Sequence, residues 1–423
     1  MKKTTKLGLV GIAAVACTLN PMKTQALSST ELIPDENGVV TLQGDVTLDN
    51  SWVIGDNIKT IDLNGHTLTR GVRYGYLINV DGPRELTIKN GTVVCGKEAA
   101  VEAGEKPEKK SSSCIRSYGS LNVDNVKVDA YWTAVKAEEG TTLNIKNSTI
   151  SSQSGTAGTI LNYGATTIDN STIKAASVPN GAAIFTMSYA DAKDGNFGAS
   201  VLVKGSTIEG YWPILLGKYD DYSEEHGLAT NVSFEGENTI ISDGGFVRKD
   251  TTREDVTLDI DGVVTAPIEA LKYLADGSTL KLNENLTEEI TVPSGITLEV
   301  PAGIAVTEGK ITFEEGAVIE NKSGEEIKVY TTVDGEEKEV AVPNNSAVSK
   351  YEEPSEPEDP TSPSDPTDPS EPEDPKEPTS PEKPDEKDPE IDNPQTFDGI
   401  SAYAVLAGIS VGAAGLVLKK NLD

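Results

Sequence analysis

Two basic residues occupy equivalent places in a chain that repeats itself, and they are the first candidates for chemistry. Arg116 and Lys136 fall in one column when the strands that precede successive repeats are aligned, and Asp124 and Asp129 are nearby in sequence. Basic and carboxylate side chains are among the groups that act in general acid–base catalysis. Because no cluster of three or more aspartates recurs in register, we favour the interpretation that Arg116 and Lys136 are solvated surface residues, and catalysis is the alternative.

Aromatic residues also recur at fixed points of the repeat. The recurring residues are Tyr118 with Tyr163, and the pair Tyr131-Trp132 with the pair Tyr211-Trp212. Adjacent residues of a strand point to opposite faces, so one member of each Tyr-Trp pair should face outward. Outward rings on a rigid face suit the stacking of sugars, which predicts a glycan-binding face. Packing within turns or against insertions is the alternative.

The segment YDDYSEEH (219–226) gathers four carboxylates that could bind Ca²⁺, an ion that takes six to eight oxygen ligands. These residues are Asp220, Asp221, Glu224 and Glu225. No fixed-spacing calcium motif is present, so a solvated acidic loop is the alternative. The chain has two histidines, His66 and His226, and His66 lies in a turn sequence. Catalysis by histidine is therefore not expected.

Two cysteines bracket a polar insertion. Cys95 and Cys114 enclose the sequence GKEAAVEAGEKPEKKSSS, which has no apolar periodicity. An exported chain can hold a disulfide, and one here would close the base of the insertion, with a stabilisation of about 3 kcal/mol. Two unpaired thiols are the alternative.

The body of the chain is a repeat with an underlying period of 22–23 residues. Five segments align without gaps: LTIKNGTV (86–93), LNVDNVKV (121–128), LNIKNSTI (143–150), TTIDNSTI (166–173) and VLVKGSTI (201–208). Their fifth residues are Asn90, Asn125, Asn147, Asn170 and Gly205. The two longer intervals contain polar insertions, and IDLNGHTL (61–68) begins the series.

Within each segment apolar and polar residues alternate up to an Asn or Gly turn, which predicts strands with one buried face. So short a unit cannot bury that face alone and must stack on its neighbours. The column before the turn holds Lys89, Asp124, Lys146, Asp169 and Lys204. Opposite charges then meet on neighbouring strands, which supports this register.

This pattern resembles the right-handed parallel β-helix of pectate lyases and many adhesins. The resemblance implies an all-β solenoid of about 22–23 residues per coil, with the turn asparagines forming an internal ladder. It also implies an alternative function, since polysaccharide lyases of this fold use an Arg or Lys as base and acids that hold Ca²⁺.

Residues 27–250 are expected to form the main β-helix, and residues 251–348 a smaller β-solenoid or a cap. Within the latter, PIEALKYLADG (267–277) begins with Pro, has apolar residues at helical spacing and ends with Gly, which predicts a short helix.

Residues 349–396 are expected to form a disordered stalk. Proline occurs at every third position from 354 to 384, the period of the polyproline II helix. At about 3.1 Å per residue, residues 352–394 span roughly 130 Å when fully extended. Its 17 acids and 3 lysines over residues 352–392 repel one another and stiffen it further.

The two ends of the chain predict export. Residues 1–26 have the basic start, apolar run and small final residue of a signal peptide. Ile400 to Leu418 form an uncharged run, about 28 Å long as a helix, before Lys419 and Lys420. Preceded by a Pro- and Thr-containing motif, this tail (397–423) resembles the cell-wall sorting signal of Gram-positive surface proteins.

The resemblance implies that a sortase cleaves after the motif and joins Thr396 to peptidoglycan. The motif residues would be Asn393, Pro394, Gln395 and Thr396. They depart from the usual pattern because Asn393 replaces Leu and Phe397 replaces Gly. A transmembrane helix retained in the membrane is the alternative.

The charge of the chain excludes nucleic acid as a partner. The formal net charge of −32 becomes −36 when the four lysines of residues 1–26 are removed, and such a surface repels polyanions. We therefore expect a cell-wall-anchored adhesin or binding protein for an extracellular glycan or protein ligand, with no cofactor except a possible Ca²⁺. A Ca²⁺-dependent polysaccharide lyase or related carbohydrate-active enzyme is the alternative.

Overall fold

A computed structural model describes residues 29–70, 75–95, 112–153, 158–179, 181–191, 195–217, 229–250 and 256–352, which lie within one compact unit, Met1–Pro354. The predicted signal peptide, sorting motif and hydrophobic run lie outside the described residues, as do residues 96–111 of the first insertion and the stalk from residue 353 onward. Among the described residues, no helix is both long and apolar enough to cross a bilayer.

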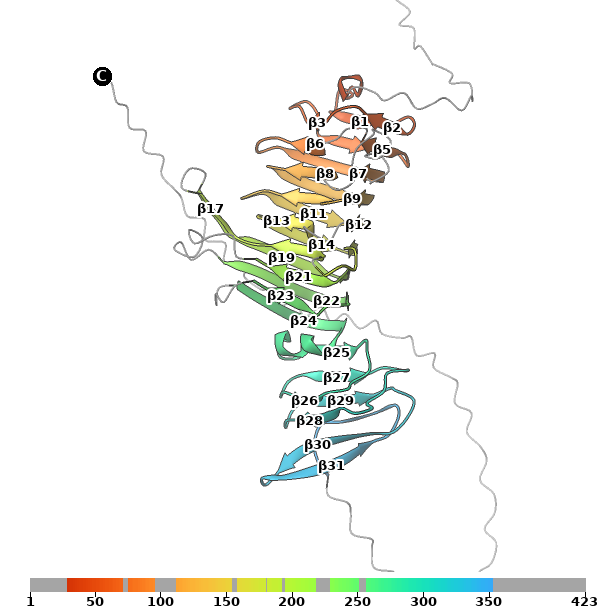
Figure 1. The fold of residues 1–423 in the computed structure, drawn as a ribbon, viewed down its shortest axis with the longest axis vertical. Helices are drawn as coiled ribbons and strands as arrows, with labels where there is room; N and C mark the ends of the chain where they lie inside the picture. Colours follow the sequence, from red (N-terminus) through yellow and green to blue (C-terminus); the bar gives the residue numbers. More distant parts are fainter. Residues whose placement is uncertain are drawn as a thin grey trace, which may run out of the picture. The chain divides into compact units, whose positions relative to one another are not determined.

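Almost all regular secondary structure of the described chain is β-strand, as the alternation of apolar and polar residues predicted (Figure 1). The larger sheet has eighteen described strands: β1 (Val39–Thr41), β2 (Val46–Leu48), β4 (Thr60–Asp62), β5 (Thr67–Arg70), β7 (Glu85–Cys95), β9 (Ser120–Ala130), β11 (Thr142–Lys146), β12 (Thr149–Ser152), β14 (Ala165–Asp169), β15 (Thr172–Lys174), β19 (Ala199–Lys204), β20 (Thr207–Gly210), β22 (Thr230–Ser242), β24 (Val256–Ala266), β25 (Thr279–Leu282), β27 (Thr297–Val300), β29 (Val318–Asn321) and β32 (Ser346–Val348).

A second sheet has eight described strands, all paired in parallel: β3 (Trp52–Val53), β6 (Gly75–Val80), β8 (Ser112–Ser117), β10 (Val135–Ala137), β13 (Gly158–Asn162), β16 (Ala182–Thr186), β21 (Trp212–Leu216) and β23 (Val247–Lys249). The chain alternates between the two sheets, from β9 to β10 to β11 and so on, so each repeat adds strands to both. A short antiparallel hairpin, β17 (Tyr189–Asp191) and β18 (Gly195–Phe197), lies within the second insertion.

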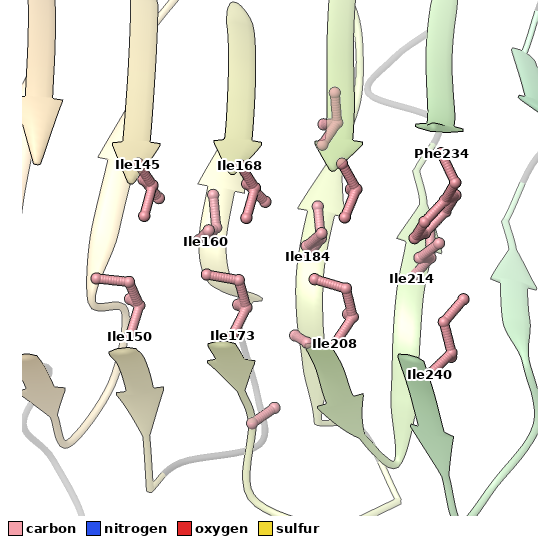
Figure 2. Packing of buried hydrophobic residues seen from close by; sticks show 14 of the residues in the cluster. Ile145, Ile150, Ile160, Ile168, Ile173, Ile184, Ile208, Ile214, Phe234 and Ile240 are labelled. Carbon is pink, nitrogen blue, oxygen red and sulfur yellow. The ribbon is translucent and has the colours of Figure 1, made fainter. Parts of the chain in front are cut away.

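The predicted register is confirmed by the strand pairing. Ile145 pairs with Val123 on one side and with Ile168 on the other, and Ile168 pairs with Val203. Figure 2 shows Ile145 and Ile168 in one such row, and Ile150 and Ile173 in a second. All these side chains are buried, and each contributes on the order of 1.5–3 kcal/mol by leaving water.

The turn position of the repeat has left-handed backbone geometry. Asn90, Asn125, Asn147 and Asn170 have φ between 46° and 59°, and Gly205 has φ 53°. Asn and Gly adopt this region more readily than other residues, which explains their recurrence at this point.

The predicted internal asparagine ladder is wrong in one respect: these side chains are exposed or half-buried rather than internal. Asn125 Nδ2 donates to Asn90 Oδ1 at 3.2 Å, and Asn147 donates instead to Asp124. The buried ladder is made by the next residue along the chain. The backbone N–H of Ser148 donates to Ser171 Oγ, and that of Ser171 to Ser206 Oγ, both at 3.0 Å. The ladder then continues through an amide, because the Ser206 N–H donates to Oδ1 of the buried Asn238 at 3.0 Å.

The alternating charge column is confirmed by the structure. Lys89 is 3.4 Å from Asp62, Lys146 is 3.8 Å from Asp169, and Lys204 is 2.7 Å from Glu235. Each exposed pair contributes little by itself, up to about 1 kcal/mol. The alternation ends where Glu235 pairs with Asp261, so like charges lie opposite each other there.

The region after residue 250 continues the larger sheet. β24 pairs in parallel with β22 and with β25, so no break in this sheet marks the predicted boundary. The predicted short helix is present as the 3-10 helix η3 (Ile268–Tyr273), shorter than residues 267–277; a second, η1 (Ser29–Glu31), lies near the start. A four-stranded sheet follows, of β26 (Glu289–Val292), β28 (Lys310–Phe313), β30 (Ile327–Val333) and β31 (Glu336–Val342), and its last pair is antiparallel.

We predict that Gly119→Ala lowers the free energy of unfolding by about 1–3 kcal/mol, because a Cβ there would lie 2.1 Å from the Arg84 carbonyl oxygen. Gly44→Ala is the matched control, since its Cβ would meet no atom within 4 Å. Thermal unfolding followed by circular dichroism measures the difference. Equal melting temperatures for the two variants would contradict this account of the packing.

Candidate functional site

Arg116 and Lys136 lie side by side on the eight-stranded sheet, as the alignment predicted. They are paired residues of β8 and β10. Just beyond these strands, Tyr118, Glu138 and Tyr163 form a second column, in which each backbone N–H donates to the preceding layer. We call Tyr76, Arg116, Tyr118, Lys136, Glu138 and Tyr163 the cationic tyrosine cluster.

A buried carboxylate is at the centre of this cluster. The Glu138 side chain is 2% exposed, and its Oε1 accepts hydrogen bonds from Arg116 Nε and from Lys136 Nζ, the latter at 2.7 Å. Arg116 and Lys136 remain partly accessible, at 31% and 17%. One acid thus fixes two cations, and the three groups together carry one net positive charge.

Tyrosine rings cover both cations. The Arg116 guanidinium carbon lies 4.4 Å from the centroid of the Tyr118 ring and 5.6 Å from that of Tyr76. Lys136 Nζ lies 4.9 Å from the centroid of the Tyr163 ring. These are cation–π distances, and partial desolvation strengthens such contacts. The cations are therefore held by an acid and by rings at once.

The charges of the cluster influence its titration. Burial acts to lower the pKa of Arg116, but the hydrogen bond and charge of Glu138 outweigh it, so this pKa is raised. Burial, reinforced by the charge of Glu138, raises the pKa of Tyr76 and of Tyr118. Burial also raises the pKa of the neighbouring Glu139. At neutral pH the cluster therefore presents a charged guanidinium beside neutral phenols.

The two tyrosines predicted to be equivalent differ in accessibility. Tyr118 is 39% exposed, and Tyr163 is 8% exposed. Tyr118 and the Arg116 guanidinium thus form the accessible part of the cluster. A flat ring next to a guanidinium with unused N–H donors can stack on one group and donate hydrogen bonds to another.

Two of the predicted acids are not part of this site. Asp124 and Asp129 belong to β9 in the other sheet, where Asp124 accepts from Asn147, and Asp129 from Ser151 and Gln153. The acid that the sequence argument missed is Glu138. Its position two residues after Lys136 places it on the same face of an extended segment, and this spacing is the signal that could have found it.

The predicted Tyr-Trp pairs are half-buried, and none of the four residues is exposed. The Tyr211 and Trp212 rings are 5.4 Å apart in an edge-on arrangement, and they lie against Gly244 and Gly245. Trp212 Nε1 also donates to the Pro179 carbonyl oxygen at 3.2 Å. These contacts are those of rings that pack against turns. Tyr131 and Trp132 make no ring contact within the part of the chain that is described.

Cys95 and Cys114 are free, fully buried thiols in the structure, which does not contain the predicted disulfide. Burial and a hydrogen bond with Cys95 raise the pKa of Cys114 well above its usual value. The Cys114 thiol thus stays protonated beside Cys95. Formation of the disulfide stays a prediction.

The remaining candidates are the acidic segment 219–226 and His66. Asp220, Asp221, Glu224, Glu225 and His226 lie outside the described residues. His66 lies in a turn, with Nδ1 3.7 Å from Asp45 Oδ1. No group of three or more acidic, His or Cys side chains within the described ranges is arranged to hold a metal ion.

We predict that Glu138→Gln lowers the free energy of unfolding by about 2–3 kcal/mol, because two partly buried cations lose their shared counter-charge. Glu139→Gln is the control, since this neighbour is half-buried and has no ion pair among the described residues. Denaturant unfolding of both variants gives the comparison. If the two variants have the same free energy of unfolding, Glu138 does not stabilise the cluster.

Comparison with known proteins gave no match: no family model, no curated protein and no solved structure resembles this chain closely enough to count. Its function is therefore argued from the geometry of the cluster.

Proposed function

We propose that this chain is an exported surface protein, anchored to the cell wall, that binds an extracellular glycan or protein ligand through the cationic tyrosine cluster. The observation that carries the proposal is the pairing of the exposed Tyr118 ring with the Arg116 guanidinium, held in place by the buried Glu138. A binding site needs such fixed groups, because their order reduces the entropy lost on binding.

The scaffold we propose is a right-handed parallel β-helix. Three observations support it: the parallel pairing of successive repeats, the alternation of the chain between two sheets and the 22-residue offset between paired strands such as β9 and β11. Parallel crossover connections are right-handed in about 98% of known cases. A rigid support of this kind keeps Arg116 and Tyr118 in fixed relative positions.

Recognition at the cluster would use both accessible groups. Sugar rings have apolar faces that stack on tyrosine, and their hydroxyl or carboxylate groups accept hydrogen bonds from arginine. A protein ligand would use the same pair, since tyrosine and arginine dominate binding hot spots. Display on an extended stalk with a wall-sorting signal favours a ligand outside the cell.

A polysaccharide lyase is the second candidate, because Arg116 and Lys136 are adjacent and both lie beside a carboxylate. A general base must be deprotonated to act, whereas the ion pair with Glu138 raises the pKa of Arg116. The same ion pair suits a binding role, in which Arg116 stays charged. We therefore place binding first.

We predict that Tyr118→Ala and Arg116→Ala each weaken binding of a positive glycan-array ligand about tenfold or more, as expected for hot-spot residues. Tyr330→Ala is the matched control, because Tyr330, like Tyr118, has a cation over its ring: Lys310 Nζ lies 4.8 Å from the ring centroid. Undiminished binding by both cluster variants would disprove the site. Release of unsaturated sugars from an acidic polysaccharide, lost in Arg116→Ala, would establish the lyase instead.

For anchoring, we predict that Thr396→Ala abolishes covalent attachment to peptidoglycan, because the chain would lack the threonine whose carbonyl the sortase joins to the wall. Purified, detergent-extracted cell walls digested with a muralytic enzyme would then release the parent protein but not the variant. Thr367→Ala, within the stalk, should remain attached. A Thr396→Ala protein that stays in the wall fraction would refute the sorting assignment.

A further inference from the structure

A second polar feature lies on the larger sheet, away from the cationic tyrosine cluster. Asn64, Asn90, Asn125 and Asn147, from four successive layers, line an open hollow of about 650 Å³. We call it the asparagine hollow. It follows the turn position of the repeat, where the left-handed backbone bends each layer.

The asparagine amides are fixed by hydrogen bonds but not used up by them. Asn90 Nδ2 donates to Asp62, Asn125 Nδ2 to Asn90, and Asn147 Nδ2 to Asp124, at 3.1–3.2 Å. An amide nitrogen has a second N–H, and its oxygen accepts two bonds. The hollow therefore holds a row of oriented donors and acceptors, one layer apart.

The turn does not require these amides. Gly205, Gly236 and Gly262 occupy the same position in later layers with φ of 53°, 72° and 121°, and the sheet continues through them. The backbone thus needs only a residue that tolerates positive φ. Asparagine side chains occur in the layers that form the hollow, where they add polar groups that the fold can do without.

One lysine interrupts a column of threonines beside the amides. The neighbours of Lys127 in this column are Thr92 and Thr149, and the column continues with Thr67, Thr172, Thr207, Thr239 and Thr265. Lys127 is exposed and has no ion pair within the described part of the chain. The acid that lines the hollow, Asp62, is balanced by Lys89 at 3.4 Å.

We infer that the asparagine hollow binds a polyhydroxylated chain that carries an anionic group. The amides and threonine hydroxyls pair with sugar hydroxyl groups along successive layers, and Lys127 pairs with a carboxylate or sulfate on that chain. This site is separate from the cationic tyrosine cluster, which belongs to the other sheet.

The test uses variants that keep the backbone of the turn. Asn125→Gly with Asn147→Gly removes two amides, and Lys127→Thr restores the residue type of the column. Asn345→Gly is the matched control: it has the same left-handed backbone, with φ 60°, and lies outside the hollow. Circular dichroism melts confirm that each full-length variant is folded.

Each protein is applied to a glycan array that carries neutral, carboxylated and sulfated forms of the same oligosaccharides. We expect a charged glycan whose binding falls about fivefold to tenfold in the double glycine variant, as lost hydrogen bonds predict. Lys127→Thr should reduce the affinity for the charged glycan to the affinity for the neutral form of the same oligosaccharide. The carboxylated and sulfated arms identify the anionic group.

Three outcomes overturn the inference: no array glycan is bound, Asn345→Gly weakens binding as much as the double variant, or binding depends on Tyr118 alone. The last result would leave the cationic tyrosine cluster as the glycan site and exclude the hollow. The converse, binding that depends on the hollow and not on Tyr118, would exclude the cluster and support this inference.

Discussion

The structure depends on the parallel pairing of each repeat with its neighbours in one fixed register. A unit of about 22 residues buries little surface alone, so its apolar face is covered only when equivalent residues stack. The isoleucine rows of Figure 2 follow from this constraint. So do the serine ladder inside the turn and the charge column outside it. A slip by one residue would turn every buried side chain outward.

The same stacking turns a periodic sequence into surfaces with columns of one chemical kind. A residue that differs in chemical kind from its neighbours in a column is a candidate for a functional role. Lys127 among threonines and Glu138 between two tyrosines are the clearest examples. In a chain of net charge −32, two cations share one buried acid, and the charges of Glu139 and Asp81 also act on the cluster. The cations thus provide fixed hydrogen-bond donors on a strongly acidic chain.

Much of the fold could be predicted because its information is local. The alternation of apolar and polar residues identified the strands, and the interval between segments gave the number of residues per layer. The alternating charges of the column from Lys89 to Lys204 tested the register. The asparagine ladder was only half right, since sequence alone shows which residue takes positive φ but not which side chain fits inside the bend. A residue just after it does: the serine Oγ, or the Asn238 Oδ1, accepts from the backbone N–H of the preceding layer.

The sequence by itself determined the repeat, its register and the juxtaposition of Arg116 with Lys136, because strand pairing places equivalent residues next to each other. Only the tertiary structure decided that Glu138, rather than Asp124 or Asp129, joins these cations. It also decided that Tyr118 is accessible whereas its equivalent Tyr163 is buried. The physical reason is that equivalent positions share backbone neighbours, while exposure depends on the different side chains that cover each layer.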